Sequence, residues 1–470
     1  MKILPLCVMF ILFTGAFLNV GLAKTAEEMS LNVIWRHGIG DGWVTSVALS
    51  SDGKTLAAGT SEGDVLVYSV DGTFWDYKTV GELVHVSISA DGQFIAAGVQ
   101  ATSDSAGALY LFSKDSSTPI WKTNGGNYLD AEISADGKYI VGGSGNSQYT
   151  SNTVYLFEAG SSTPILSYNT ANSPDFVGIS SDGSYFVASD EKNIYLFSNT
   201  SQEPLWIYNI GYGPRTNVDI TSDGKIIVAG VESEYLKYSG GYLLLFSKES
   251  NSPVWSTRNG GPFFDLSISS DSNNIAVIGN DGYVYSYQDR TFAYRYQVCL
   301  PPELDDTGAA YGTDVVVSPD GNYLASFSNY TVVAVFSKSS TTPVFKYNAE
   351  SSLSSDGDGL AMASTLDGLT IAIAEFKAIV LLSPSAGTVL GSPLILVAVL
   401  STVAVSIIVV LLYSRKRKRY KERHSVTSST NRLKHASLML KPTMPASNDV
   451  TAIGTLYRWE QIRNRRGSCA

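Results

Sequence analysis

Between residues 31 and 384, apolar and polar residues alternate in short runs that stop at turn-forming residues. Val47 and Leu49 alternate with small or polar neighbours, and Leu266 and Ile268 do the same in a later run. A period of two is typical of a strand with one buried face, and no helical pattern is evident in this region. The pattern predicts an all-β domain of short strands.

An aspartate turn recurs between successive runs. Its aspartates are Asp52, Asp91, Asp136, Asp182, Asp223, Asp271, Asp320 and Asp367, and they are 39 to 49 residues apart. Glycine follows the aspartate in every copy except one, where Ser272 takes its place. Asp-Gly between alternating runs predicts a hairpin, because glycine accepts the positive φ of such turns. We expect these aspartates to be structural caps of their own turns.

Each repeat contains four strands in this interpretation. After the hairpin comes a Leu-Tyr-Leu-Phe-like run, as at residues 109–112, 194–197 and 243–246. A loop rich in Ser, Thr and Pro then leads to a strand with an aromatic residue, as at 119–121 and 204–206. Four short antiparallel strands per 40 to 50 residues form one blade of a β-propeller.

The number of blades depends on how the ring closes. The eighth unit, residues 360–382, has three strands, whereas residues 32–36 resemble a fourth strand without a unit of their own. Pairing the two would complete the last blade and remove unpaired strand edges. The sequence predicts an eight-bladed β-propeller over residues 31–384; seven blades plus a degenerate hairpin is the alternative.

The two ends of the chain have apolar runs of different kinds. Lys2 precedes an apolar stretch over residues 3–20 and small residues at 21–23, which predicts a secretory signal peptide over 1–23, with an uncleaved anchor as the alternative. Residues 394–413 are uncharged and long enough to span a bilayer, with five basic residues at 415–419 directly behind them. A basic flank marks the cytoplasmic side. These features predict a single-pass protein of the cell membrane, N-terminus outside and C-terminus cytoplasmic.

Charge divides at the expected membrane helix. Residues 24–413 carry 40 acidic and 18 basic side chains, whereas residues 414–470 carry 3 acidic and 14 basic ones. We expect a basic, disordered cytoplasmic tail over 414–470 that lies near anionic lipids and does not bind nucleic acid. Cys299 is the one cysteine between the two apolar runs, so no disulfide within the ectodomain is expected. Asn199 and Asn329 begin glycosylation sequons.

Two families resemble these repeats. The hairpin at residues 47–59 resembles the WD-repeat superfamily, and residues 109–121 are similar to repeats of pyrroloquinoline-quinone dehydrogenases. The second resemblance implies that the tryptophan of the fourth strand packs between blades. True WD units carry Gly-His and Trp-Asp pairs, whereas this chain has no Gly-His pair and a single Trp-Asp pair, at residues 75–76. A lone Cys299 cannot form the adjacent-cysteine disulfide that holds the quinone in those enzymes. The resemblance covers residues 31–384 and implies a fold, with a non-catalytic, membrane-anchored, quinoprotein-like member as the expectation.

Candidate binding groups occupy the start of the innermost strands. Six residues before the turn aspartates stand Ser46, His85, Asp130, Phe176, Asn217, Asp265, Asp314 and Ala361. In a propeller these positions gather at one mouth of the central channel, where Asp130, Asp265 and Asp314 would suit a hard cation such as Ca²⁺. Solvated residues that merely line the mouth are the alternative.

Three long links between the second and third strands suggest a binding face. They span residues 99–108, 144–153 and 231–241, and all should emerge on one side of the ring. The third contains Glu232, Glu234, Tyr235 and Tyr238, a composition typical of contact surfaces. Loops on a rigid scaffold often carry function, although neutral insertions are the alternative.

No catalytic constellation is visible in the sequence. The ectodomain has two histidines, His37 and His85, neither in a nucleophile motif, and it has no clustered zinc ligands at short spacing. We therefore expect an extracellular binding or scaffold module, a receptor, adhesion protein or complex subunit, that binds a protein or another surface ligand on one propeller face and is not an enzyme. A quinoprotein-type cofactor protein or enzyme is the alternative.

Overall fold

The structure is a computed structural model, and within residues 29–384 it describes most of the chain. The described ranges are 29–70, 73–123, 126–146, 150–211, 216–233, 240–258, 263–279, 283–297, 312–328, 332–338, 340–348, 362–365, 368–375 and 377–384. Every regular element in these ranges is a β-strand, as the sequence predicted. The predicted signal peptide (1–23), membrane helix (394–413) and basic tail (414–470) lie outside them. Within the described ranges, no helix has the length and apolar character that a membrane crossing requires.

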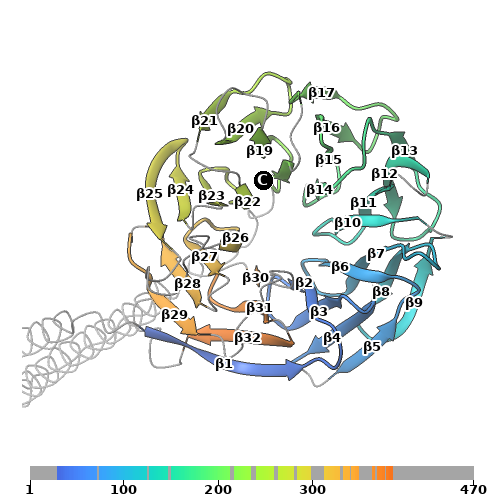
Figure 1. Cartoon of the computed structure of the whole chain (residues 1–470), viewed down its shortest axis with the longest axis horizontal. Coiled ribbons are helices and arrows are strands. Elements are labelled where there is room, and N and C mark those ends of the chain that lie inside the picture. The colour runs from blue at the N-terminus through green and yellow to red at the C-terminus, as the bar shows by residue number, and fades with distance from the viewer. Residues whose placement is uncertain are drawn as a thin grey trace, which may run out of the picture. The chain divides into compact units, whose positions relative to one another are not determined.

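In the described residues, thirty-two strands form eight antiparallel blades arranged in a ring (Figure 1). Blade 1 contains β2 (Val44–Leu49), β3 (Thr55–Thr60), β4 (Asp64–Ser69) and β5 (Phe74–Lys78). Blade 2 contains β6 (Glu82–Ile88), β7 (Phe94–Gln100), β8 (Ala108–Ser113) and β9 (Ser116–Lys122). Blade 3 contains β10 (Tyr128–Ile133), β11 (Tyr139–Asn146), β12 (Thr150–Glu158) and β13 (Leu166–Asn169). Blade 4 contains β14 (Phe176–Ile179), β15 (Tyr185–Ser189), β16 (Asn193–Ser198) and β17 (Trp206–Asn209).

The second half of the ring follows the same order. Blade 5 contains β18 (Thr216–Ile220), β19 (Ile226–Ser233), β20 (Gly240–Ser247) and β21 (Trp255–Arg258). Blade 6 contains β22 (Phe263–Ile268), β23 (Asn274–Gly279), β24 (Tyr283–Gln288) and β25 (Thr291–Gln297). Blade 7 contains β26 (Gly312–Val317), β27 (Tyr323–Ser328), β28 (Val332–Ser337) and β29 (Phe345–Asn348). Blade 8 contains β30 (Met362–Ser364), β31 (Ile371–Glu375), β32 (Ala378–Pro384) and, from the other end of the chain, β1 (Met29–Gly38).

Strand β1 closes the ring and confirms the eight-bladed prediction. It pairs antiparallel with β32 from Leu31 opposite Pro384 to Gly38 opposite Ala378, and its first two residues pair parallel with β29 of blade 7. An ion pair adds to this closure, since Arg36 Nη2 lies 2.7 Å from Oε2 of the buried Glu375. The Tyr347 hydroxyl donates to the other oxygen of Glu375 at 3.1 Å. The outermost strand of blade 8 therefore joins its inner strands and the neighbouring blade.

Aromatic side chains of the fourth strands pack between blades, as the family resemblance implied. Trp75 of blade 1 lies with its ring centroid 5.3 Å from that of Phe112 in blade 2, and its Nε1 donates to the Lys114 carbonyl at 2.7 Å. Trp121 and Trp206 make the equivalent hydrogen bonds to the next blades, at 2.8 and 3.0 Å. Each tryptophan thus buries apolar area and satisfies its N–H in the same contact.

The repeated turn has a side-chain hydrogen-bond pattern that explains its sequence. In blade 4, the Ser180 hydroxyl donates to Asp182 Oδ1 at 2.9 Å, and the same oxygen accepts the backbone N–H of Ser184. Gly183 between them has φ of +68°. The equivalent serine or threonine donates to the turn aspartate in the other six blades whose turn is described, and those aspartates are Asp52, Asp91, Asp136, Asp223, Asp271 and Asp320. The aspartates cap their own hairpins, as predicted.

In two of the three long links, the described residues belong to strands. Pairing between β11 and β12 continues to Asn146 opposite Thr150, and pairing between β19 and β20 continues to Ser233 opposite Gly240. In blade 4 the corresponding pairing ends at Ser189 opposite Ile194. The described parts of the expected loops over 144–153 and 231–241 therefore extend the strands of their hairpins, whereas residues 101–107 of blade 2 form a loop without regular structure.

Candidate functional site

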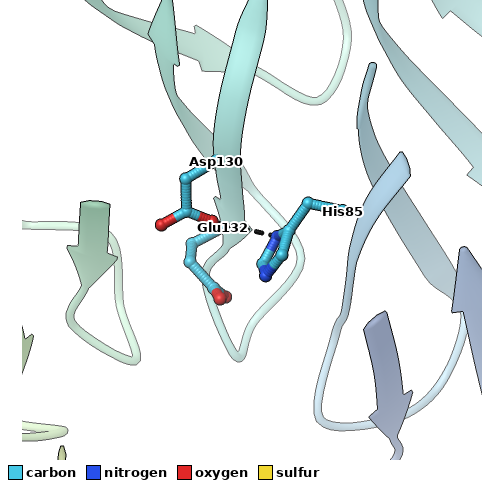
Figure 2. A group of neighbouring side chains, drawn as sticks. All are labelled: His85, Asp130 and Glu132. Carbon is cyan, nitrogen blue, oxygen red and sulfur yellow. Dashed lines mark ion pairs between the residues drawn. The ribbon is translucent and has the colours of Figure 1, made fainter. Parts of the chain in front are cut away.

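The innermost strands of blades 2 and 3 bring three titratable side chains together near the axis of the ring. Figure 2 shows His85 on β6 facing Asp130 and Glu132 on β10. Strand alternation explains why both carboxylates face the histidine, since Asp130 and Glu132 are two residues apart. One ligand-type atom from each of the three lies within 4.8 Å of the others, and the described residues hold no second group of this kind.

Asp130 connects three strands. Its Oδ1 lies 2.9 Å from Nδ1 of His85 and accepts the backbone N–H of Ala131 at 2.8 Å. Its Oδ2 accepts the backbone N–H of Val177 on β14, in blade 4, at 2.8 Å. The Asp130 side chain is 10% exposed and that of His85 is 37% exposed. The carboxylate is therefore held in place by blades 2, 3 and 4 together.

Glu132 is joined to blade 2 through a serine. The Ser87 hydroxyl donates to Glu132 Oε2 at 2.6 Å and accepts the backbone N–H of Ile133 at 3.1 Å. Ser87 and His85 lie on the same face of β6, so both side chains of this face contact β10. Together the contacts form a polar interface between two innermost strands.

Burial and neighbouring charges shift the pKa values of His85 and Glu132. Burial lowers the pKa of His85, but the charge and hydrogen bond of Asp130, together with the charge of Glu132, outweigh burial and raise this pKa to about 9. Burial raises the pKa of Glu132, and the Asp130 charge raises it further, against the opposing effect of His85. The imidazolium form of His85 is therefore favoured beside two carboxyl groups that repel each other.

Similar contacts continue around the axis. Asp219 on β18 accepts the backbone N–H groups of Ile220 at 2.7 Å and of Ile268, in blade 6, at 3.2 Å. Burial raises the pKa of Asp219 to about 7, and the charge of Asp265 adds to that increase. Asp265 in turn accepts the backbone N–H of Val315 in blade 7 at 2.9 Å. Polar side chains of the innermost strands thus hold consecutive blades together.

The three aspartates predicted to hold a cation differ in their positions. Asp130 belongs to the group with His85 and Glu132, whereas Asp265 and Asp314 lie outside it. Asp314 is half-buried on β26. The predicted Ca²⁺ site on these three aspartates stays a prediction.

Sequence reasoning missed Glu132 and Asp219. Both stand four residues before a turn aspartate, whereas the candidate binding groups were sought six residues before it. The signal was available, because residues two apart on a strand share a face. A carboxylate four residues before the turn aspartate was the sign of a larger polar interface between the innermost strands.

The predicted binding face lies at the same end of the ring as this group. Asp130 pairs with Gly143, three residues before the extended part of β11 ends at Asn146. Glu232 belongs to the extension of β19 and pairs with Gly241, whereas Glu234, Tyr235 and Tyr238 lie outside the described residues. Asn199 lies in the turn after β16, partly exposed, and Asn329 lies outside the described residues.

Comparison with known proteins defines the class of fold. No family model matches the chain, and no curated protein matches it in sequence. Solved structures do match, among them the crystal structure of the C-terminal WD40 domain of Sif2, with a TM-score of 0.57 and 15% identity over 76% of this chain and 98% of that domain. At this identity the similarity concerns the fold. The chain has a WD40-like β-propeller fold of eight blades.

Proposed function

We propose that this protein is a membrane-anchored binding scaffold whose propeller lies outside the cell and binds a protein partner at the end of the ring with the extended hairpins. The observation that carries this proposal is the unequal length of the hairpins. Blades 3 and 5 continue strand pairing beyond the point at which blade 4 ends it, on the same side of the ring. Backbone pairing holds the described part of each projection in place, which lowers the entropy cost of binding.

The fold supports a binding role. A WD40-like propeller is a rigid scaffold, and loops on such scaffolds tend to carry function. Glu232 lies near the end of β19, and the other predicted contact residues, Glu234, Tyr235 and Tyr238, follow it in the sequence. Tyrosine supplies a large contact area with few rotatable bonds.

The binding role can be tested with matched variants. The Tyr235→Ala/Tyr238→Ala variant should lose partners that the full chain captures in proximity labelling on intact cells. Lys225→Ala changes an exposed lysine in the aspartate turn of the same blade, at the opposite end of its strands, and should retain them. Equal capture by both variants would contradict the proposed face.

The membrane topology rests on sequence features. An apolar N-terminal run, the uncharged stretch at 394–413 and the basic flank at 415–419 support an external propeller and a cytoplasmic tail near anionic lipids. Protease added to intact cells should remove the propeller and spare an epitope placed after Ala470. Asn199 should then carry a glycan that glycosidase removes. Protection of the propeller would contradict the orientation.

A non-catalytic, quinoprotein-like origin of the blades is part of the same proposal. The interblade packing of Trp75, Trp121 and Trp206 supports it. The purified chain should show no visible absorption from a bound quinone. A cofactor spectrum in protein from its native source would favour the quinoprotein alternative.

A further inference from the structure

A histidine and two carboxylates meet where blades 2 and 3 face each other, and these are the ligand types of a transition-metal site. We propose that His85, Asp130 and Glu132 bind one divalent transition-metal ion of the zinc class. This site is independent of the proposed partner, and it shares Asp130, but not Asp265 or Asp314, with the Ca²⁺ site expected from the sequence.

The geometry requires little movement. Zinc ligands of the nitrogen and carboxylate type lie about 2.0–2.2 Å from the ion, so tetrahedral ligand atoms are roughly 3.3–3.6 Å apart. His85 Nδ1 and Asp130 Oδ1 are 2.9 Å apart, and the three ligand atoms lie within 4.8 Å of one another. Binding therefore asks the first pair to open slightly, and a shift of the Glu132 side chain by about 1 Å at most brings it within range. Three protein ligands leave a fourth position for water or another ligand.

The surroundings orient the ligands as metal sites require. Asp130 is held by backbone N–H groups of Ala131 and Val177, and Glu132 accepts the hydroxyl of Ser87. Hydrogen bonds of this kind fix the direction of ligating carboxylates. The ligands come from two blades and Val177 from a third, so the ring itself supplies the preorganisation.

Charge favours a cation at this place. Asp130 and Asp219 both act on Glu132, and Asp265 acts on Asp219, so that carboxyl groups outnumber the one imidazole. A divalent ion replaces the proton on His85, which leaves to solvent, and it adds positive charge between carboxylates that repel each other.

The imidazole nitrogen decides the class of metal. Imidazole suits zinc, copper, iron and nickel, whereas calcium and magnesium prefer all-oxygen sites. The group thus differs in kind from Asp130, Asp265 and Asp314, the oxygen-only set expected from the sequence.

The test compares zinc binding by variants of the purified full chain after chelator treatment. Equilibrium dialysis against Zn²⁺ in excess Ca²⁺, followed by elemental analysis, measures the bound metal. His85→Asn and Glu132→Gln, which keep the approximate shape of the side chains, should each weaken the proposed site at least tenfold and so lose one equivalent at limiting Zn²⁺. His37→Asn and Asp223→Asn are controls that change a histidine and a carboxylate elsewhere in the propeller and should bind as the unchanged chain does. His424, His435 and the cysteines remain in every variant, so their contribution cancels.

Co²⁺ provides a second readout, because its visible spectrum reports coordination by the site directly. The unchanged chain should develop d–d bands that are weaker in both site variants. Melting temperatures in chelator show whether the variants fold, and Glu132→Gln removes a repelled charge and should fold normally. Equal Zn²⁺ content in the unchanged chain and both site variants would overturn the proposal. Displacement of the bound Zn²⁺ by Ca²⁺ would also overturn it and would favour an oxygen-only site.

Discussion

At the scale of single residues, the turn that recurs in each blade combines a conformational requirement with close packing. Gly183 has φ of +68°, and a Cβ placed there would lie 2.3 Å from Cδ2 of Tyr139 in the preceding blade. Ser272 occupies the same position in blade 6 with φ of +60°. The backbone geometry is therefore kept even where the residue is not glycine, and packing decides which positions accept a side chain.

Gly183→Ala should destabilise the propeller. Left-handed backbone costs a non-glycine residue about 1–2 kcal/mol, and the contact with Tyr139 adds overpacking of about 1–3 kcal/mol. Gly160→Ala is the matched control, since a Cβ there meets nothing within 4 Å and its φ is not positive. Urea unfolding should show a loss of roughly 2–5 kcal/mol for the first and little change for the second. Equal midpoints for both would contradict the packing argument.

The group around His85 gives the fold a distinctive pH dependence. The folded pKa of His85 is raised from 6.5 to about 9, so its contribution to stability is full below pH 6.5 and is lost as pH rises through 9. The pKa of Asp219 is raised from 3.8 to about 7, so ionisation of this carboxyl also costs stability as pH rises from about 4 to 7. The raised pKa of Glu132 acts in the same direction.

The turn aspartates act in the opposite sense. Hydrogen bonds lower the pKa of Asp52 and Asp182 below 3.8, so their contribution is lost in acid. With chelator present, melting temperature should be highest at about pH 4–5 and should fall toward pH 9. His85→Asn should flatten the decline between about pH 6.5 and 9, whereas His37→Asn should not. A maximum above pH 8 in the unchanged chain would contradict the assignment.

At the scale of elements, an aromatic residue of the fourth strand joins a blade to the next one. Trp75 is 8% exposed, contacts Phe112 and donates to the Lys114 carbonyl. Leu205 directly precedes Trp206, the equivalent tryptophan of blade 4, and is 47% exposed. Along this motif, burial therefore changes from solvent exposure just before the strand to an interblade contact at its aromatic residue.

Trp75→Phe and Trp75→Ala separate the two parts of this contact. Trp75→Phe removes the Nε1 hydrogen bond and should lower the free energy of unfolding by about 1–2 kcal/mol, because the Lys114 carbonyl loses its donor. Trp75→Ala removes the ring as well and should lower the free energy of unfolding by about 3–5 kcal/mol. Leu205→Ala should change the free energy of unfolding by less than about 1 kcal/mol. If denaturant unfolding gave the same value for Trp75→Ala and Leu205→Ala, the tryptophan would not be an interblade anchor.

At the scale of the whole molecule, closure depends on a strand from the opposite end of the chain. Strand β1 pairs with β32 and touches β29, and its Arg36 pairs with the buried Glu375. Without β1, two strands would expose unpaired edges, which favours aggregation. Ring closure is thus a property of residues more than 300 positions apart in sequence.

A chain that starts at Asp41 should fold poorly compared with one that starts at Lys24. We expect a melting temperature lower by several degrees or aggregation on expression, measured by scanning calorimetry and size-exclusion chromatography. Arg36→Gln should lower stability less than removal of β1, because the strand pairing remains and Glu375 loses only its charged partner. Breaking a buried ion pair costs about 3–5 kcal/mol at most. Identical melting of the two chains would show that β1 does not close the ring.

Much of the fold followed from local chemistry. Period-two alternation marks the strands, the Asp-Gly pairs mark hairpins, and the unmatched strand at residues 32–36 predicted the closure that β1 makes. Each of these signals depends on backbone geometry within a few residues, which is why a single sequence contains it.

Other features depended on the tertiary structure. His85 and Asp130 are 45 residues apart, and whether their side chains meet depends on the curvature of the ring and on the register shift between Tyr128 and Asp130. The residues near 145 are rich in Gly, Ser and Asn, which predicts a loop. They extend a hairpin instead, because pairing with a neighbouring strand can override a weak local preference for a loop. The sequence alone determined the repeat and its closure, since these follow from local periodicity. The tertiary structure decided which side chains of neighbouring blades form one site, since that depends on distances between strands that no local pattern encodes.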